Sequence, residues 1–414
     1  MRVLLITGKG GVGKTSVAAA TGLRAAAAGL RTLVMSTDPA HSLADALDTE
    51  LSGQPVEVAP RLEAEQLDAR RHLEDNWRQI QEYLIALLSW GGVDEVEAEE
   101  LSVVPGLEEL FGLLDVRRHV EAAAHDLLVV DCAPTAETLR LLSLPHALGW
   151  YLERVFPVQR KVANVVRPML GRVTTMPLPQ DRVLEAVEGL HATLGAVRAI
   201  LTDGERTTVR LVTNLEKIVV AEAQRTYTHL ALFGYHVDAV IVNRMLPEEV
   251  TDPYFARWKA LQSEHLEAVR ERFHDVPVLT APLFADEPLG PEGLAPLAEA
   301  AYGDRDVAAV LHRGRPLRVE RTGDGYVLSL ALPLVDKREL DVFRRADELY
   351  VKVGASTRSI ALPAALRRCA VVGAGISDER LEVRFAEPDI RRSDEAVDPA
   401  GAAAPRSPRT AQGS

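Results

Sequence analysis

The chain has 414 residues, and its 60 Asp and Glu outnumber 47 Lys and Arg to give a formal net charge of −13. Such an acidic chain is a poor general binder of nucleic acid or of anionic membranes, so any anion site must be local. The two cysteines, Cys132 and Cys369, are too far apart in sequence to build a disulfide framework or a Cys-x-x-Cys metal pair. Because the chain is so acidic, we expect no nucleic-acid partner.

The first residues run directly into an apolar strand and a glycine-rich loop. They lack the charged segment, apolar core and cleavage site of a secretory signal. No stretch approaches the ~20 apolar residues that a membrane-spanning helix requires. We expect a cytoplasmic protein with no integral membrane segment.

Short apolar runs alternate with helical patterns from the N-terminus to about Pro288. The runs are nearly continuous in apolar character, as expected for parallel strands that are buried on both faces. They are Val3–Thr7, Thr32–Thr37, Leu127–Asp131, Val209–Asn214, Ala239–Asn243 and Val276–Leu279. This alternation predicts a doubly wound, mostly parallel α/β domain within residues 1–312.

Two stretches of this domain are longer than a plain crossover between strands requires. One covers about residues 43–125 and contains no good strand candidate, and the other covers about residues 144–201. We expect both to be helical insertions.

The pattern changes after about Pro316. The segment LRVERTGDGYVLSLALP alternates about a turn at Gly323–Gly325, which is typical of a β-hairpin. Further short strands follow, so residues 316–386 are predicted to form a small all-β sandwich. Apolar residues then become scarce, and residues 387–414 are predicted to be a disordered tail.

Gly8 to Thr15 spell G-K-G-G-V-G-K-T, a phosphate-binding pattern placed between a predicted strand and a predicted helix. Its glycines let backbone N–H groups wrap the phosphates, and the helix N-terminus adds favourable partial charge. Lys14 would reach the β- and γ-phosphates of ATP, and the Thr15 hydroxyl would ligate Mg²⁺. The predicted nucleotide-binding residues of this loop are Gly8, Gly10, Gly11, Val12, Gly13, Lys14, Thr15 and Ser16.

Two aspartates follow predicted strands. Asp131 ends the run LLVVD, where a carboxylate can hold Mg²⁺ directly or through water, although strand-terminal aspartates are also common in turns. Asp38 ends the second strand and can orient the water that attacks the phosphate, and the alternative is an Asp-Pro turn. We assign a catalytic role to Asp38 and a metal-binding role to Asp131.

Lys9 is a second lysine in the phosphate loop, at a position that needs no charge. Beside the phosphates of its own chain, its ammonium would repel that of Lys14. The repulsion is avoided if Lys9 points outward into the phosphates of a neighbouring subunit, where it would act as an arginine finger does. The alternative is an exposed loop lysine. We predict the catalytic role.

Three segments, KGGVGKT, STDPAHSLADAL and VVDCAPTAETLRLLSLP, resemble the deviant Walker A, switch I and Walker B/switch II motifs of one ATPase family. It is the family of arsenical pump-driving ATPases and tail-anchored-protein targeting ATPases, and the resemblance covers about residues 1–300. It implies that Asn243 contacts adenine, for which a strand-end cap is the alternative. It also implies that the loop Pro282–Glu287, which includes Pro282 and Phe284, borders the nucleoside.

The resemblance further implies a Mg²⁺-dependent ATPase that forms a homodimer with two nucleotides at its interface. Lys9 would act across that interface, and switch I (Asp38–Ser42) and switch II (Asp131–Thr135) would couple ATP to opening and closing. The clustered cysteines of arsenite-responsive members and the zinc-binding Cys-x-x-Cys of eukaryotic targeting members are absent. Arsenite stimulation and zinc-bridged dimerisation are therefore not expected.

The C-terminal β domain resembles the α-crystallin-like domain of small heat-shock proteins, a fusion found in bacterial members of this ATPase family. Ala374 and Leu381 match the spacing of a late A-x-x-x-x-G-x-L signature, whereas Glu379 replaces its glycine. Such a domain would bind exposed apolar segments or stabilise the assembly.

A cargo site has two candidate segments, Trp77–Trp90 and Leu144–Leu170. In the first, apolar residues recur at helical spacing, but ordinary core is favoured for such faces by about two to one. The predicted function is ATP hydrolysis by a switching homodimer that handles an anion or metalloid pump partner or an apolar membrane-protein client. The alternatives are a ParA/MinD-type positioning ATPase and a chaperone-like binding protein with a regulatory nucleotide site.

Overall fold

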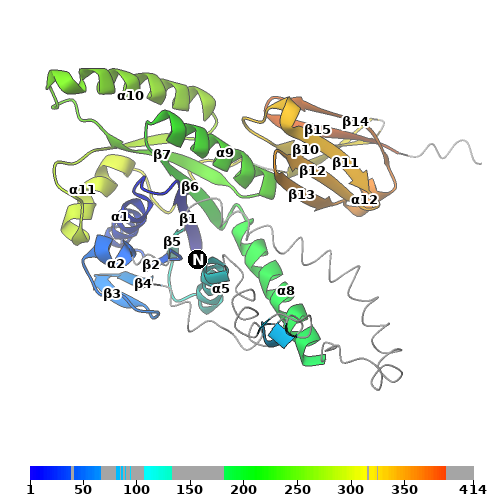
Figure 1. The fold of residues 1–414 in the computed structure, drawn as a ribbon, viewed down its shortest axis with the longest axis horizontal. Helices are drawn as coiled ribbons and strands as arrows, with labels where there is room; N and C mark the ends of the chain where they lie inside the picture. The colour runs from blue at the N-terminus through cyan, green and yellow to red at the C-terminus, as the bar shows by residue number, and fades with distance from the viewer. Residues whose placement is uncertain are drawn as a thin grey trace, which may run out of the picture.

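The computed structural model describes residues 1–38, 42–66, 107–132, 181–314, 317–323 and 325–387, together with isolated positions between 81 and 94. Several expectations fall outside the described residues: the tail from residue 388, most of Trp77–Trp90, all of Leu144–Leu170, and switch II beyond Cys132. Figure 1 shows a large α/β domain with a smaller β domain beside it.

An eight-stranded sheet forms the centre of the larger domain, in the order β3-β4-β2-β5-β1-β6-β7-β8. All neighbouring strands pair in parallel except β3 and β4, which are antiparallel. The strands are β1 (Arg2–Gly8), β2 (Thr32–Ser36), β3 (Val56–Ala59), β4 (Leu62–Gln66), β5 (Leu127–Asp131), β6 (Thr207–Thr213), β7 (Val237–Met245) and β8 (Val278–Pro282). The predicted doubly wound, mostly parallel α/β fold is confirmed.

Strands β3 and β4 lie within residues 43–125, where we expected no strand, and that expectation is wrong. Strand β4 pairs with β2 from Leu62 onward and ends in Glu65 and Gln66, two polar residues that are buried. Polar residues interrupt the apolar run by which a buried strand is recognised in sequence. In the fold, the Glu65 carboxylate pairs with Arg118 and the Gln66 side-chain nitrogen donates to the carbonyl oxygen of Asp38, so a strand can bury these two residues.

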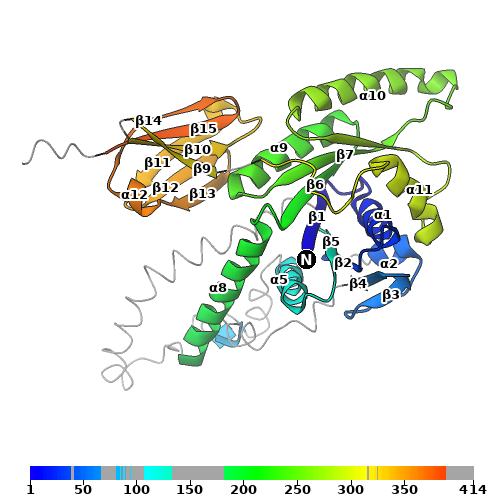
Figure 2. The same ribbon diagram turned by 180° about the vertical axis from the view of Figure 1, so that it is seen from behind.

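Helices cover both faces of the sheet. Side chains alternate along β1, so Val3 and Leu5 enter one apolar cluster while Leu4 and Ile6 enter the other. Helices α1, α2 and α11 pack on the second face, and α5, α8, α9 and α10 pack on the first (Figures 1 and 2). These helices are α1 (Lys14–Ala27), α2 (Ser42–Leu47), α5 (Leu107–Ala122), α8 (Asp181–Leu201), α9 (Lys217–Phe233), α10 (Pro253–Arg272) and α11 (Gly290–Tyr302).

None of the helices in the described part of the chain combines the length and the apolar character that crossing a membrane would require.

The smaller domain consists of two antiparallel sheets around an apolar core. Its four-stranded sheet has the order β14-β15-β10-β9, and its three-stranded sheet has the order β11-β12-β13. Pairing of Thr322 with Gly325 confirms the predicted hairpin. The elements are β9 (Leu317–Thr322), β10 (Gly325–Ala331), β11 (Leu340–Arg345), β12 (Glu348–Val353), β13 (Ser356–Ala361), α12 (Ala364–Arg367), β14 (Ala370–Ser377) and β15 (Arg380–Ala386).

Candidate functional site

The phosphate loop connects the end of β1 to the start of α1. Gly13 caps the helix with φ +89°, a left-handed conformation that favours glycine, and a Cβ added there would lie 2.4 Å from Asn243 Nδ2. Gly11 has φ +81°. The loop therefore needs glycine at both positions, and it leaves the N-terminus of a 14-residue helix available to an anion in the loop.

Lys14 lies in the first turn of α1, and only 7% of its surface is exposed. Its ammonium donates to the carbonyl oxygen of Lys9 at 3.3 Å, so the side chain reaches back over the loop. Among the described residues, no carboxylate forms an ion pair with it. A buried ammonium without a directly paired carboxylate is costly, and a phosphate in the loop would supply a close counter-charge.

Asp131, at the end of β5, is fully buried behind the loop. Its Oδ2 accepts hydrogen bonds from the hydroxyls of Thr15 at 2.8 Å and Ser36 at 3.2 Å. Its Oδ1 has no hydrogen-bond partner among the described residues. Burial raises the pKa of this carboxyl to about 6, and the hydrogen bond from Thr15 and the charge of Lys14 oppose that rise.

Thr15 completes a set of hard oxygen atoms at this point. Its hydroxyl lies 3.2 Å from Ser42 Oγ, at the start of α2, as well as against Asp131. Mg²⁺ prefers a few carboxylate and hydroxyl oxygens together with phosphate and water. The free Oδ1 of Asp131 and the Thr15 hydroxyl fit such an ion.

Asp38 follows β2 and is held through its backbone. Its N–H donates to Ser36 Oγ at 3.2 Å, and the side-chain amide of Gln66 donates to its carbonyl oxygen at 2.8 Å. Ser36 thus joins Asp38 to Asp131, since its hydroxyl donates to the buried carboxylate. The sequence interpretation missed Ser36 and Gln66: the first lies in the STDPAHS motif, while nothing in the sequence marks the second.

Asn243, near the end of β7, is hydrogen-bonded to the phosphate loop. Its Nδ2 donates to the carbonyl oxygen of Val12 at 3.0 Å, and its Oδ1 accepts from the N–H of Arg244 at 2.9 Å. The guanidinium of Arg244, a residue that the sequence interpretation also missed, donates to the carbonyl oxygen of Gly11 at 3.0 Å. In this arrangement the nitrogen and the oxygen of the Asn243 side-chain amide each bond to backbone, and its contact with adenine stays a prediction.

A cavity of about 260 Å³ adjoins the loop on this side. It brings together Ser16, Asn243, Pro282 and Phe284, four residues that the sequence placed near the nucleotide. The remaining lining comes mainly from the segment 283–288 and Leu297 of α11. A cavity of this size beside a phosphate loop is large enough for a flat heterocycle.

Lys9 points out of the loop toward α9. Its ammonium lies 3.5 Å from Glu222 Oε2 on that helix, and the two side chains are 35% and 32% exposed. It is therefore directed toward a carboxylate of its own chain, and its role in a neighbouring subunit stays a prediction. No feature of the sequence pointed to Glu222.

A family model for anion-transporting ATPases matches residues 1–303, which include the loop and all eight strands of the large sheet. The chain belongs to this family. A second model, for the HSP20-like domain found in ArsA, matches residues 323–385 of this ATPase and thus most of its β-sandwich. Both resemblances inferred from the sequence motifs are confirmed.

Individual relatives agree with the family assignment. The ATPase is 36% identical over 377 residues to a protein of Aquifex aeolicus provisionally named arsenical pump-driving ATPase 1, covering 89% of this chain and 95% of the relative. It is 38% identical over 391 residues to a protein of Chlorobaculum tepidum with a similar provisional name, covering 93% and 96%. It is 28% identical over 306 residues to ATPase GET3 of Chaetomium globosum, covering 72% and 89%. Nucleotide binding and ATP hydrolysis follow from membership of this family.

The raised pKa of Asp131 predicts a stability effect. Between its ordinary pKa of 3.8 and the folded value of about 6, the folded state binds more protons than the unfolded state, so this group lowers stability as pH rises. Asp131→Asn keeps an oxygen for Thr15 and Ser36 and removes the buried charge. We expect it to stabilise the nucleotide-free, metal-free protein by roughly 2–3 kcal/mol at neutral pH and much less near pH 4, measured by urea unfolding.

Asp126→Asn is the matched control. Asp126 lies just before β5 and bonds to Arg31, which lowers the pKa of its carboxyl to about 2. Loss of this carboxylate should therefore destabilise the protein. The effect should be larger above pH 4, where the carboxylate is charged in both the folded and the unfolded state. The burial argument for Asp131 fails if Asp131→Asn destabilises the protein at neutral pH as Asp126→Asn does.

Proposed function

We propose that this ATPase is a Mg²⁺-dependent, nucleotide-switched homodimer whose cycle drives the handling of a cargo. The observation that carries the proposal is the orientation of Lys9. A charged residue of the phosphate loop that faces away from its own phosphates is suited to the phosphates of a second copy. The family match favours this function over the ParA/MinD-type alternative.

Thr15 and Asp131 would hold the metal ion, and the ion would neutralise charge on the phosphates during transfer. Lys14 would bind the phosphates of its own chain's nucleotide. Asp38, fixed at its backbone by Ser36 and Gln66, would orient the attacking water with its carboxylate. In the closed dimer, Lys9 would leave Glu222 and contact the partner's nucleotide.

The cargo is proposed to be a membrane pump partner or an apolar client, in line with the names of the relatives. Soft metalloids bind clustered thiolates. The two cysteines here are both buried, one following β5 in the α/β domain and one in the sandwich. This arrangement favours a cargo other than a metalloid that is held by thiols.

The test of the proposal uses Asp38→Asn, which should bind ATP and Mg²⁺ without hydrolysing the nucleotide. We expect ATP and Mg²⁺ together to shift this variant from monomer to dimer in sedimentation velocity, and the dimer to retain cargo during purification. Asp304→Asn, at an exposed position after α11, is the control and should cycle as the wild type does. A sedimentation coefficient of Asp38→Asn that ATP and Mg²⁺ leave unchanged contradicts the dimer switch.

A further inference from the structure

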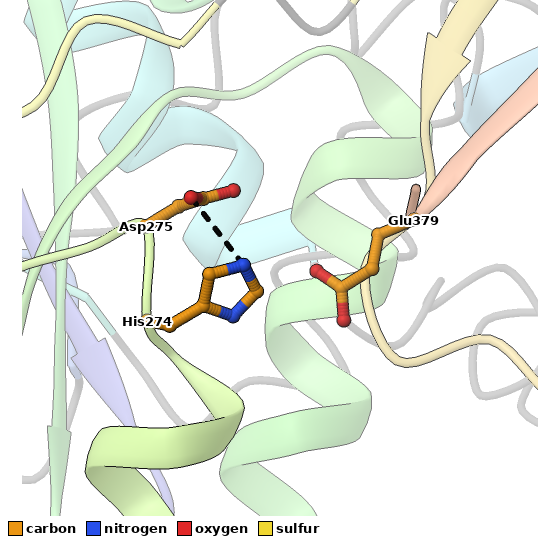
Figure 3. Close-up of side chains that lie close together, drawn as sticks. All are labelled: His274, Asp275 and Glu379. Carbon is orange, nitrogen blue, oxygen red and sulfur yellow. Dashed lines mark ion pairs between the residues drawn. The ribbon is translucent and has the colours of Figure 1, made fainter. Parts of the chain in front are cut away.

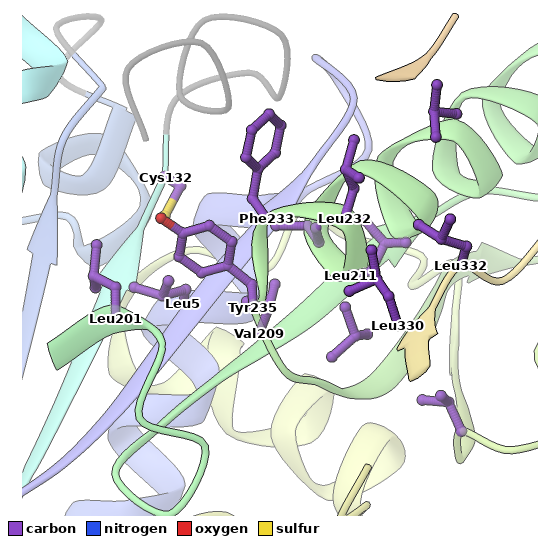
Figure 4. Packing of buried hydrophobic residues seen from close by; sticks show 14 of the residues in the cluster. Leu5, Cys132, Leu201, Val209, Leu211, Leu232, Phe233, Tyr235, Leu330 and Leu332 are labelled. Atoms are coloured by element: carbon purple, nitrogen blue, oxygen red, sulfur yellow. The ribbon is translucent and has the colours of Figure 1, made fainter. Parts of the chain in front are cut away.

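The β-sandwich is docked on the C-terminal half of α9. Helix α9 contacts β10 and β13, and the Thr228 hydroxyl donates to the carbonyl oxygen of Pro333 at 2.6 Å. Leu232 and Phe233 of α9 share one apolar cluster with Leu330 and Leu332 of the sandwich (Figure 4). The core of the α/β domain therefore continues into the sandwich through this helix.

Arg358 of β13 is the polar centre of this contact. Only 7% of the residue is exposed. Its guanidinium donates to the carbonyl oxygen of Leu232 in the last turn of α9. A Cβ added to Gly234, the residue that ends α9 with φ +90°, would lie 3.3 Å from Arg358 Nη2. A cation at this end of a helix binds the free carbonyls and interacts favourably with the helix dipole.

Apart from these contacts with the end of α9, burying the guanidinium costs free energy. Burial, together with the charge of Arg198 on α8, lowers the pKa of Arg358 to about 10. In the described part of the chain no carboxylate forms an ion pair with Arg358, and its Nε has no hydrogen-bond partner. An arginine buried under these conditions points to a function beyond packing, because an apolar side chain would cost less free energy to bury.

The other end of α9 contacts the nucleotide site. Glu222, in the second turn, forms the ion pair with Lys9, and it lies about 15 Å along the helix axis from Leu232. Just past the helix, the Tyr235 hydroxyl points toward Cys132, the residue that follows Asp131 (Figure 4). One helix therefore joins the sandwich to both the phosphate loop and the end of β5.

We propose that Arg358 is a positioning residue for ATP hydrolysis. By fixing the C-terminal turn of α9, it keeps Glu222 where it holds Lys9, so the docked β-sandwich opposes the release of that lysine. A helix moves as a rigid body over this length, so a displacement at Leu232 is transmitted to Glu222. The inference rests on the proposed function, in which Lys9 must leave Glu222 to reach a second copy.

The size of the effect is set by the Lys9–Glu222 pair. Exposed ion pairs of this kind change an equilibrium by about two- to five-fold. We therefore expect Glu222→Gln to lower the ATP concentration that gives half-maximal dimerisation by about that factor. Arg358→Met, which keeps the apolar stem and removes the donors, should give a similar or smaller decrease.

A double-mutant cycle tests the route. If Arg358 acts through Glu222, the double variant Arg358→Met/Glu222→Gln should behave as Glu222→Gln alone. If the two effects multiply, or if Arg358→Met leaves dimerisation unchanged in a protein of wild-type thermal stability, the inference is overturned. Arg358→Lys provides the second variant if Arg358→Met does not fold, because it keeps a cation at Leu232 and should restore wild-type dimerisation if the inference holds.

The domain junction also offers a matched control. His274 and Asp275, in the turn before β8, lie close to Glu379 in the turn between β14 and β15 (Figure 3). His274 Nε2 is 3.4 Å from Asp275 Oδ1, and both side chains are more than half exposed. This cluster lies at the same junction, but among the described residues it shares no hydrogen bond or ion pair with Arg358, Leu232 or Glu222, so Glu379→Gln should leave dimerisation unchanged. A change equal to that of Arg358→Met would assign the effect to general loosening of the junction and overturn the inference.

A failure of the proposed function can be distinguished from a failure of the role proposed for Arg358. If Lys9→Ala dimerises with ATP as the wild type does, the proposed function fails. If Lys9→Ala impairs dimerisation while the effects of Arg358→Met and Glu222→Gln multiply, only the positioning role of Arg358 fails.

Discussion

Replacing Lys14 by alanine is expected to lower kcat/KM for ATP hydrolysis by about 10²–10³-fold. The buried ammonium lies over the phosphate loop, and a pre-positioned charge in such a site stabilises the transferring phosphoryl group far more than a charge in water would. The affinity for ATP should also fall, because the same contact exists before transfer. Phosphate release and isothermal titration of ATP measure the two effects.

Lys352→Ala is the control for this substitution, since Lys352 is an exposed lysine on β12 of the sandwich. Its kcat/KM should equal that of the wild type. A Lys14→Ala variant that hydrolyses ATP at the wild-type rate would show that the activity of the preparation does not arise at this loop.

The phosphate loop was predictable because its geometry depends on local sequence. Glycine is required wherever φ is positive or another chain approaches closely, and Gly13 meets both conditions. The strand before the loop and the helix after it then fix where Lys14 and Thr15 lie. Asp131 was predictable for a similar reason, because it ends an apolar run, LLVVD, that is typical of a strand buried on both faces.

Residues that depend on tertiary contacts were not predictable. Gln66 holds Asp38 only because β4 pairs with β2, and β4 was missed since its polar end looks like a surface segment. In the fold, Glu65 is buried because His119 of α5 lies 2.8 Å from it. Similarly, Glu222 and Arg358 read as ordinary surface residues of a helix and a strand until the fold places them against Lys9 and Leu232.

Lys9→Ala is expected to reduce hydrolysis by about 10³-fold or more, comparable to the loss of an arginine finger, while a single chain still binds ATP through Lys14. The side chain contacts Glu222 and not the phosphate position in its own chain, so its removal should not weaken the affinity of the isolated subunit. Hydrolysis and ATP affinity, measured on the same preparation, separate these effects. An equal loss of affinity would instead place Lys9 on the nucleotide of its own chain.

Mixing two inactive variants decides whether Lys9 acts in the partner's site. In a dimer of Lys9→Ala with Lys14→Ala, the site on the Lys9→Ala chain keeps its own Lys14 and receives Lys9 from the other chain, whereas the second site lacks both. If equal amounts of the two variants are mixed before ATP is added, about half of the dimers that then form are mixed, so activity should return to about a quarter of the sites. If Lys9 acts within its own chain, every site in every dimer lacks a lysine, and mixing restores nothing.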